Sequence, residues 1–200
     1  MTAMSTAYEQ HGRTAQKQRT RNALVAAARD LIAEGLAPTV EATADAASIS
    51  RTTAYRYFPN QRALVAAAYP ETEATSLLPP DGPADPEARL QLVMTECLRI
   101  LFDNEPQQRA MLRLSLDVVP HDPGELPLRQ GRVIGWLTDA LEPLREELGD
   151  ARLRRLVLAI RSTTGIEAMV WLVDVAGLTR AEAAEQMRWT ALALYRSEVG

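Results

Sequence analysis

Residues 48–64 read SISRTTAYRYFPNQRAL, and this stretch decides the fold. Between Ser50 and Pro59, arginine, threonine and tyrosine side chains crowd into about two helical turns. Packing a small core does not require so many hydrogen-bonding groups in one place. The stretch therefore predicts a short helix that contacts another molecule.

Four helices are expected in the amino-terminal part of the chain: 14–35, 39–47, 51–58 and 61–69. Apolar residues from Leu24 to Ile32 recur at helical spacing in the first, and Gly35 is a stop signal after it. Thr39 can cap the second helix and Ser50 can cap the third. The third helix, 51–58, is the segment crowded with polar side chains.

The composition changes at residues 77–86, LLPPDGPADP, which hold four prolines and one glycine and so predict a boundary or loop. Helical periodicity then returns in five longer segments: 88–104, 107–119, 128–148, 151–176 and 179–199. There is no strand pattern and no repeat. The sequence predicts an all-α chain of about nine helices, with a helix-turn-helix domain at 15–70 and a helical domain at 71–200.

A helix, a short turn and a second short helix form a helix-turn-helix, whose second helix enters the DNA major groove. On this interpretation Arg51 can read a guanine through its O6 and N7 atoms. Thr52 and Thr53 can bond a base edge or contact a thymine methyl group. These three residues are the predicted base readers.

Other polar groups of the segment suit phosphate contacts. The hydroxyls of Tyr55 and Tyr57 can reach phosphates and set the docking angle without reading sequence. Thr39, at a helix N-terminus, offers a hydroxyl and backbone N–H groups to another phosphate. The alternative interpretation is that 48–58 is a packed helical hairpin with its tyrosines in the core.

This part of the chain also resembles the DNA-binding domain of the TetR (tetracycline-repressor-like) family, over about 50 residues within 20–69. The resemblance rests on ALVAAARDLIAEG followed by TVEATADAASISRTTAYRYFPNQRAL, with the spacing of Thr39, Ala44, Ile49, Ser50, Thr53, Tyr55, Tyr57, Phe58 and Leu64. It implies a homodimeric repressor on a palindromic operator in double-stranded DNA. It also implies carboxy-terminal helices that dimerise and hold a small effector.

The resemblance implies that the family's base-contacting positions correspond to Arg51, Thr52 and Thr53. Its phosphate-contacting positions fall on Thr39, two tyrosines and the start of the fourth helix. The full set of predicted phosphate contacts is Arg21, Thr39, Ser50, Tyr55, Tyr57, Gln61 and Arg62.

Three positions depart from the family pattern. Ser48 stands where the turn usually has glycine, and a left-handed conformation would cost a non-glycine residue roughly 1 kcal/mol. We therefore expect that turn to differ. Thr43 replaces a large aliphatic residue and thins the core under the second helix. Gln61 replaces a lysine that meets phosphate, which should lower the salt slope by about 0.9, and Arg62 could compensate.

Net charge is −4 over 200 residues, but residues 1–70 carry +3 and the rest −7. This asymmetry suggests that the amino-terminal part faces a polyanion. The N-terminal arm, with Arg13, Lys17, Arg19 and Arg21, is either a disordered solvated tail or a flexible extension that contacts DNA. Arg21 is the arm residue expected to make a contact.

Other classes of protein are disfavoured by the composition. No apolar run reaches the roughly 18 residues of a membrane span, and no secretory signal is present. Cys97 is the single cysteine, and with two distant histidines it argues against a disulfide or a metal site. No phosphate loop, di-iron motif or activated nucleophile indicates an enzyme, and no cofactor is expected. A cytoplasmic protein is the default interpretation.

The larger domain is expected to contain an effector pocket and a dimer interface. Soft, aromatic and polar residues on neighbouring helices are the pocket candidates: Met94, Cys97, Met111, Trp136, Arg161, Thr164, Glu167 and Met169. The alternative is a plain core with Arg161 and Glu167 at its rim. A small-to-large stripe and a final helix that is apolar on two faces give the interface candidates: Gly165, Ala168, Leu172, Met187, Trp189, Ala191, Leu194 and Tyr195.

The predicted function is that of a dimeric, sequence-specific DNA-binding regulator, a repressor released by a small apolar effector. Two alternatives stay open: a helix-turn-helix protein with no small-molecule effector, and an all-helical scaffold or enzyme.

Overall fold

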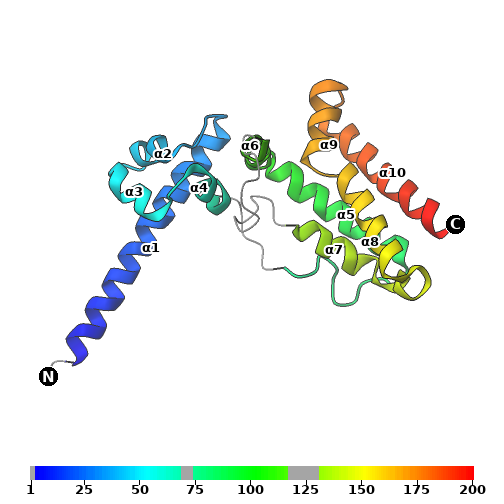
Figure 1. The fold of residues 1–200 in the computed structure, drawn as a ribbon, viewed down its shortest axis with the longest axis horizontal. Helices are drawn as coiled ribbons and strands as arrows, with labels where there is room; N and C mark the ends of the chain where they lie inside the picture. Colours follow the sequence, from blue (N-terminus) through cyan, green and yellow to red (C-terminus); the bar gives the residue numbers. More distant parts are fainter. Residues whose placement is uncertain (1–2, 69–73, 117–130) are drawn as a thin grey trace. The chain divides into compact units, whose positions relative to one another are not determined.

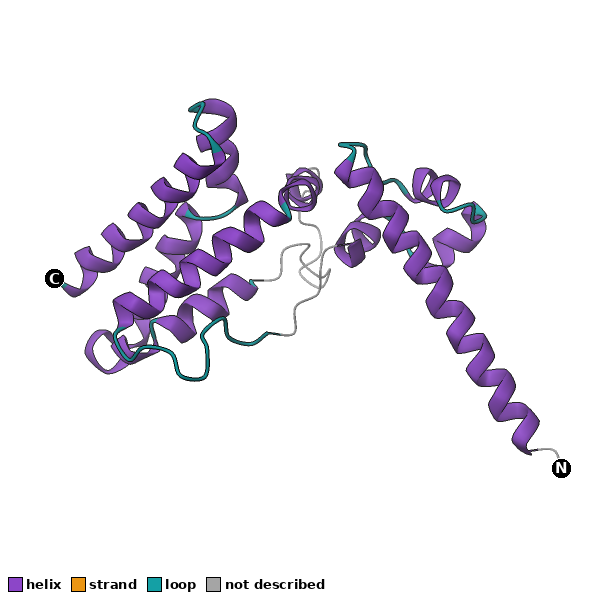
Figure 2. Cartoon of the chain, turned by 180° about the vertical axis from the view of Figure 1, so that it is seen from behind, coloured by secondary structure: helices purple, strands orange, loops and turns teal. Residues whose placement is uncertain are grey.

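The secondary structure is helical throughout the computed structural model, which describes residues 3–68, 74–116 and 131–200 (Figure 1). Figure 2 shows helices joined by loops, with no strand among these residues, so the all-α class is confirmed. Contacts divide the chain into two units, Met1–Glu71 with Arg109–Leu128 and Thr72–Gln108 with Arg129–Gly200. The first unit thus takes in a second stretch of chain, which a single boundary near residue 70 does not represent.

The first unit contains α1 (Ala3–Ala33), α2 (Val40–Ala46), α3 (Arg51–Tyr57) and α4 (Gln61–Ala68). Its core takes one or more apolar side chains from each helix: Leu24, Val25, Ala28, Ile32, Val40, Ala44, Ala54, Phe58, Leu64, Val65 and Ala68. Met111, on α6 (Glu105–Leu116), belongs to the same core. The apolar side chains that recur at helical spacing in the sequence therefore face inward, as expected.

The turn between α2 and α3 adopts the geometry that the sequence made doubtful. Ser48 has a φ of +53°, in the left-handed region. Its N–H donates to the Asp45 carbonyl at 3.1 Å, and the Ile49 N–H donates to the Ala44 carbonyl at 2.9 Å. These two bonds form a Schellman motif that satisfies the last carbonyls of α2. The expectation that this turn would differ is wrong, because the motif is formed with serine in the glycine position.

The amino-terminal arm is part of α1. This helix begins at Ala3, so the backbone of the arm is helical in the structure. Lys17 and Arg19 are exposed on it, and Arg19 donates to the side chain of Gln16. The basic residues therefore lie on a regular helix that runs into the core of the first unit at Leu24.

The second unit is built around α5 (Pro86–Asp103), α7 (Arg132–Ala140), α8 (Arg145–Thr163) and α10 (Arg180–Val199). α10 packs on α5 and α8, and α7 packs on the same two helices, so the four close into a bundle (Figure 1). Fully buried residues fill its interior: Leu90, Met94, Leu137, Leu141, Leu153, Ile160, Met169 and Met187.

The two long helices predicted at 128–148 and 151–176 are differently divided in the structure. A 3-10 turn, η1 (Glu142–Leu144), follows α7, and α8 then runs past Gly149, which has a φ of +71°. Residues 128–130 lie outside the described part of the chain. The boundary expected at 149–150 therefore lies nearer to residue 141.

The predicted helix 151–176 breaks at Thr164 and Gly165, and it resumes as α9 (Ile166–Val170) and a π-helical turn, η2 (Trp171–Val175). The Thr164 hydroxyl donates to the Ile160 carbonyl at 2.7 Å. At Gly165, the guanidinium of Arg161 occupies the space that a Cβ atom would need. A local hydrogen bond and a side chain packed over the backbone thus accompany the break.

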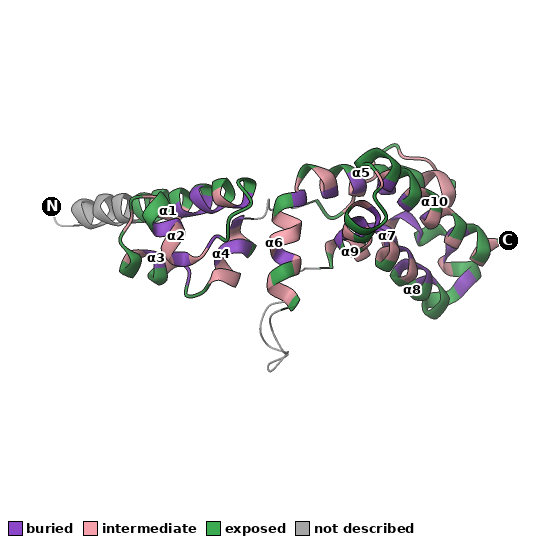
Figure 3. Cartoon of the chain, turned by 90° about the horizontal axis from the view of Figure 1, so that it is seen from above, coloured by how far each residue is buried: buried purple, intermediate pink, exposed green. Residues whose placement is uncertain are grey.

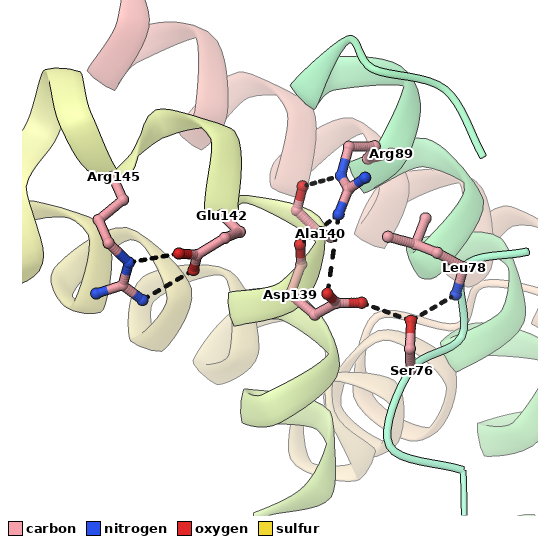
Figure 4. Close-up of polar contacts among 7 residues, drawn as sticks. All are labelled: Ser76, Leu78, Arg89, Asp139, Ala140, Glu142 and Arg145. Carbon is pink, nitrogen blue, oxygen red and sulfur yellow. Dashed lines mark hydrogen bonds and ion pairs between the residues drawn. The ribbon is translucent and has the colours of Figure 1, made fainter. Parts of the chain in front are cut away.

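The residues just before the proline-rich loop are bonded to the bundle (Figure 4). The Ser76 hydroxyl donates to the Asp139 carboxylate at the end of α7. Arg89 of α5 donates to the Asp139 backbone carbonyl at 2.8 Å. The Trp136 indole donates to the Ala74 carbonyl at 2.9 Å. Two side chains of α7 therefore hold residues 74–76 in place, and Arg89 of α5 bonds the end of α7 itself.

One stretch of the described residues, Glu142–Val175, has the length and apolarity of a membrane-crossing helix. It is assembled from several elements, interrupted at Gly149 and again before α9. Leu153 and Ile160 within it are buried in the bundle. We therefore interpret this stretch as the apolar core of the second unit.

Candidate nucleic-acid interface

α3 is anchored by two residues and turns its polar side chains outward. Ala54 is fully buried and Phe58, which follows the helix, is 4% exposed. Arg51, Thr52 and Tyr55 are exposed. Figure 3 colours part of α3 as exposed. The packed-hairpin alternative thus fails for the outer face of α3.

The N-terminal end of α3 is held by its cap. The Ser50 hydroxyl oxygen accepts from the Thr53 N–H at 3.3 Å and the Ser50 hydroxyl donates to the Thr53 hydroxyl at 2.9 Å. Thr53 is half-buried, whereas Arg51 and Thr52 are exposed. Of the three predicted base readers, Arg51 and Thr52 are the most accessible.

Arg51 is paired with a carboxylate of α2. Its Nη2 lies 3.0 Å from Oδ2 of Asp45, and the two side chains are 63% and 61% exposed. The hydrogen bond to Asp45, together with its negative charge, raises the pKa of Arg51. The guanidinium is thus oriented by the protein while it stays open to solvent.

The two tyrosines of α3 have different surroundings. Tyr55 is exposed, and its hydroxyl donates to the Glu41 carboxylate of α2. That hydrogen bond lowers the pKa of Glu41 and raises the pKa of Tyr55. Tyr57 is half-buried against the core, with the Arg56 guanidinium 5.8 Å from its ring centroid. Tyr55 is therefore the more exposed tyrosine, with its hydroxyl bonded to Glu41, and Tyr57 is partly a core residue.

The other predicted phosphate contacts lie around α3 in the same unit. Thr39 caps α2 by accepting from the Ala42 N–H at 3.1 Å. The Arg21 guanidinium lies 5.7 Å from the ring centroid of Phe58, within cation–π range. Gln61 is half-buried at the start of α4. Nη1 of Arg62 is buried without a hydrogen-bond partner, so this side chain is poorly placed to substitute for a missing lysine.

Sequence reasoning missed Glu41 and Asp45. The two are four residues apart on α2, which places them on one helix face, and this signal was available in the sequence. Their pairing with Tyr55 and Arg51 depends on how α2 crosses α3. That crossing is a tertiary property, so the partners could not be assigned from spacing.

The predicted pocket residues divide between the two units. Met94, Trp136 and Met169 are buried in the second unit, and Thr164 is 7% exposed there. Met111 instead packs in the core of the first unit. The proposed set is therefore not brought together in full.

The polar members of that set also lie in the second unit. Nη1 of Arg161 lies 3.8 Å from a carboxylate oxygen of Glu167. Burial raises the pKa of the Cys97 thiol to about 12, although the charge of Arg161 opposes this shift. Cys97 is thus a neutral thiol near an arginine.

The predicted dimer residues are mostly covered within one chain. Gly165, Leu172, Met187, Ala191 and Tyr195 are buried. Ala168 and Leu194 are half-buried, and Trp189 is 64% exposed on α10. The buried residues pack inside their own chain, so Trp189 is the member of the set most available to a second copy.

Comparison with known proteins supports the assignment made from geometry. Residues 24–68 match the sequence model of the family described as "Bacterial regulatory proteins, tetR family". This range contains α2, α3 and α4 complete and the buried part of α1. A search of curated proteins finds no match.

The fold and the exposed second helix of the motif define a helix-turn-helix DNA-binding transcription regulator. The match covers the amino-terminal domain alone, and it supports a regulator of the TetR family.

Proposed function

We propose that the protein is a homodimeric repressor that acts in the cytoplasm, binds a palindromic operator and is released by a small apolar effector. The single observation that carries the DNA-binding part is the geometry of α3. Two apolar residues hold this helix to the core, while Arg51, Thr52 and Tyr55 remain exposed. Such a helix can enter a major groove without unfolding any part of its support.

The dimer part of the proposal is supported by the outer faces of α8 and α10, which pack against each other. Trp189 on α10 and Leu158 on α8 are 64% and 40% exposed. Large apolar side chains on neighbouring helices are typical of a surface that a second copy covers. Two-fold symmetry would then present two copies of α3 to successive major grooves, about 34–36 Å apart.

The effector part is supported by polar groups within the bundle of the second unit. Cys97, Arg161 and Thr164 interrupt an otherwise apolar interior, and a few polar groups in an apolar site can orient a ligand. Ligand binding would shift the dimer toward a spacing that no longer matches the operator. Such coupling typically corresponds to about 1–3 kcal/mol.

In this proposal the effector signal is transmitted through α4. The division between the two units falls inside α6, between Gln108 and Arg109. Met111 of this helix lies in the core that α3 and α4 share. We therefore include α6, together with α4, in the proposed path.

A second candidate function is a DNA-binding regulator with no small-molecule effector. It is favoured by the satisfied state of two polar groups that were assigned to the pocket. The Trp136 indole and the Thr164 hydroxyl already donate to backbone carbonyls of the same chain. A thermal-shift screen separates the candidates, because a compound that stabilises the protein and releases DNA supports the effector.

The DNA-binding proposal is tested by selecting bound sequences from a random duplex pool. We expect the protein to select a palindrome and Arg51→Ala to lose preference at one position of each half-site. Arg154→Ala is the matched control, because Arg154 is an exposed arginine on α8 of the second unit. Failure of the unaltered protein to select any sequence would overturn the proposal.

A further inference from the structure

The outer face of α3 is contacted by two carboxylates of α2. Asp45 bonds Arg51 at 3.0 Å, and Glu41 accepts a hydrogen bond from Tyr55. The two acids are four residues apart on α2, a helix of seven residues. Both acids lie next to the residues that are proposed to meet DNA, where a negative charge opposes binding to phosphates.

The two partners differ in how many hydrogen bonds they can donate. Arginine has five N–H groups, and the contact between Nη2 and Asp45 occupies one of them. Two N–H groups are enough to bond O6 and N7 of a guanine. Arg51 can therefore keep its contact with Asp45 while it reads a base.

We propose that Asp45 is a positioning residue that holds Arg51 in the orientation that reads guanine, and so sets base specificity at one position of each half-site. This inference rests on the proposed DNA binding by α3. An exposed arginine without a partner samples many rotamers and can bond phosphates as readily as bases. Anchored to the backbone of α2 through Asp45, the guanidinium presents its free edge in one direction.

Asp45 therefore lowers the affinity for DNA of any sequence and raises the discrimination between sequences. Its charge repels the phosphates of every sequence to a similar degree, whereas the orientation of Arg51 favours only sequences with guanine at the right position. Loss of the carboxylate should leave or raise binding to unrelated DNA and weaken the preference for guanine. A residue with a purely structural role would instead lower binding to all sequences together.

Glu41 provides the matched control for this charge effect. A tyrosine hydroxyl has one proton, so Tyr55 cannot donate to Glu41 and to a phosphate at the same time. Removing Glu41 takes the same charge from the same helix but leaves the contact between Arg51 and Asp45 intact. Because phosphates carry no sequence information, its loss should raise affinity for all sequences alike.

The test compares the full-length protein with Asp45→Ala and Glu41→Ala in selection from a random duplex pool. The position read by Arg51 is defined as the one whose preference disappears in Arg51→Ala. In Asp45→Ala we expect the guanine preference at that position to fall by about fivefold or more, since a bidentate contact discriminates by roughly that factor at least. Preferences elsewhere should stay, and Glu41→Ala should keep the whole pattern.

A double-mutant cycle adds a readout of the pair itself. In an Arg51→Ala background, Asp45→Ala should change base preference no further, because its effect acts through the arginine. Asp45→Asn keeps one acceptor oxygen and should show an intermediate loss, which also covers the case in which the alanine variant folds poorly.

The outcomes separate this inference from the function on which it rests. If the unaltered protein selects no sequence, the proposed function fails and the inference falls with it. If the protein selects a palindrome but Asp45→Ala keeps the same discrimination, the inference alone is overturned. An equal loss in Glu41→Ala would also overturn it, because the effect would then be one of charge.

Discussion

Ser48 is the one non-glycine residue with positive φ among the described residues. A side chain in the left-handed region costs roughly 1 kcal/mol, and the Schellman motif at the end of α2 holds the residue there. The turn positions α3, so the strain lies in the part of the motif that sets the recognition helix.

We expect Ser48→Gly to stabilise the protein by about 1 kcal/mol, because glycine adopts this conformation without steric conflict. The melting temperature should rise by about 2–4 °C in a chain of this length. Ala46→Gly, in the last helical turn of α2, is the control and should destabilise by about 1 kcal/mol. Equal shifts in thermal unfolding for the two variants would contradict the argument.

Thr43 illustrates a buried polar group without a partner. Its side chain is fully buried, and its hydroxyl oxygen has no hydrogen-bond partner. We expect Thr43→Val to stabilise the protein by about 1 kcal/mol, because valine has the same shape and no group to desolvate. Denaturant unfolding measures the change, with the exposed Thr52→Val expected to stay within about 0.5 kcal/mol. Destabilisation by Thr43→Val would show that the hydroxyl has a partner in solution.

The N-terminal end of α4 is a predicted site of contact with the DNA backbone. The Asn60 side chain caps it by accepting from the Ala63 N–H at 2.8 Å, and Gln61 is its first residue. The helix therefore offers backbone N–H groups and a neutral side chain in the place of a cation.

We expect Gln61→Lys to raise DNA affinity for all sequences and to steepen the salt dependence by about 0.9, the value for one added phosphate contact. Gln186→Lys, on the exposed face of α10, carries the same charge change away from the helix-turn-helix. Binding measured over a series of salt concentrations gives both slopes. An unchanged slope in Gln61→Lys would place the start of α4 away from the DNA backbone.

At the scale of the whole molecule, the proposed dimer can be tested at Trp189. We expect Trp189→Glu to leave a folded monomer that binds the operator at least tenfold more weakly, since a symmetric site requires both copies of α3. Trp171→Glu is the matched control, because Trp171 is a similarly exposed tryptophan on η2. Light scattering after size exclusion reports the mass, and a dimeric Trp189→Glu would remove α10 from the proposed interface.

The all-α class, the helix caps and the helix-turn-helix motif could be predicted from the sequence alone. Ser50 and Thr39 were expected as caps, and each accepts the backbone hydrogen bond that its position predicts. Such contacts join residues three positions apart, so local sequence is enough to specify them. The same holds for the exposed polar face of α3, which follows from the spacing of its two anchors.

Contacts between distant segments required the packed structure. Asp45 reaches Arg51 because α2 and α3 cross, and Met111 joins the first unit although it lies far along the chain. Met187 is buried inside its own chain rather than left for a second copy. The sequence shows that an apolar or charged side chain needs a partner. Which residue becomes that partner depends on how the helices cross in the folded structure.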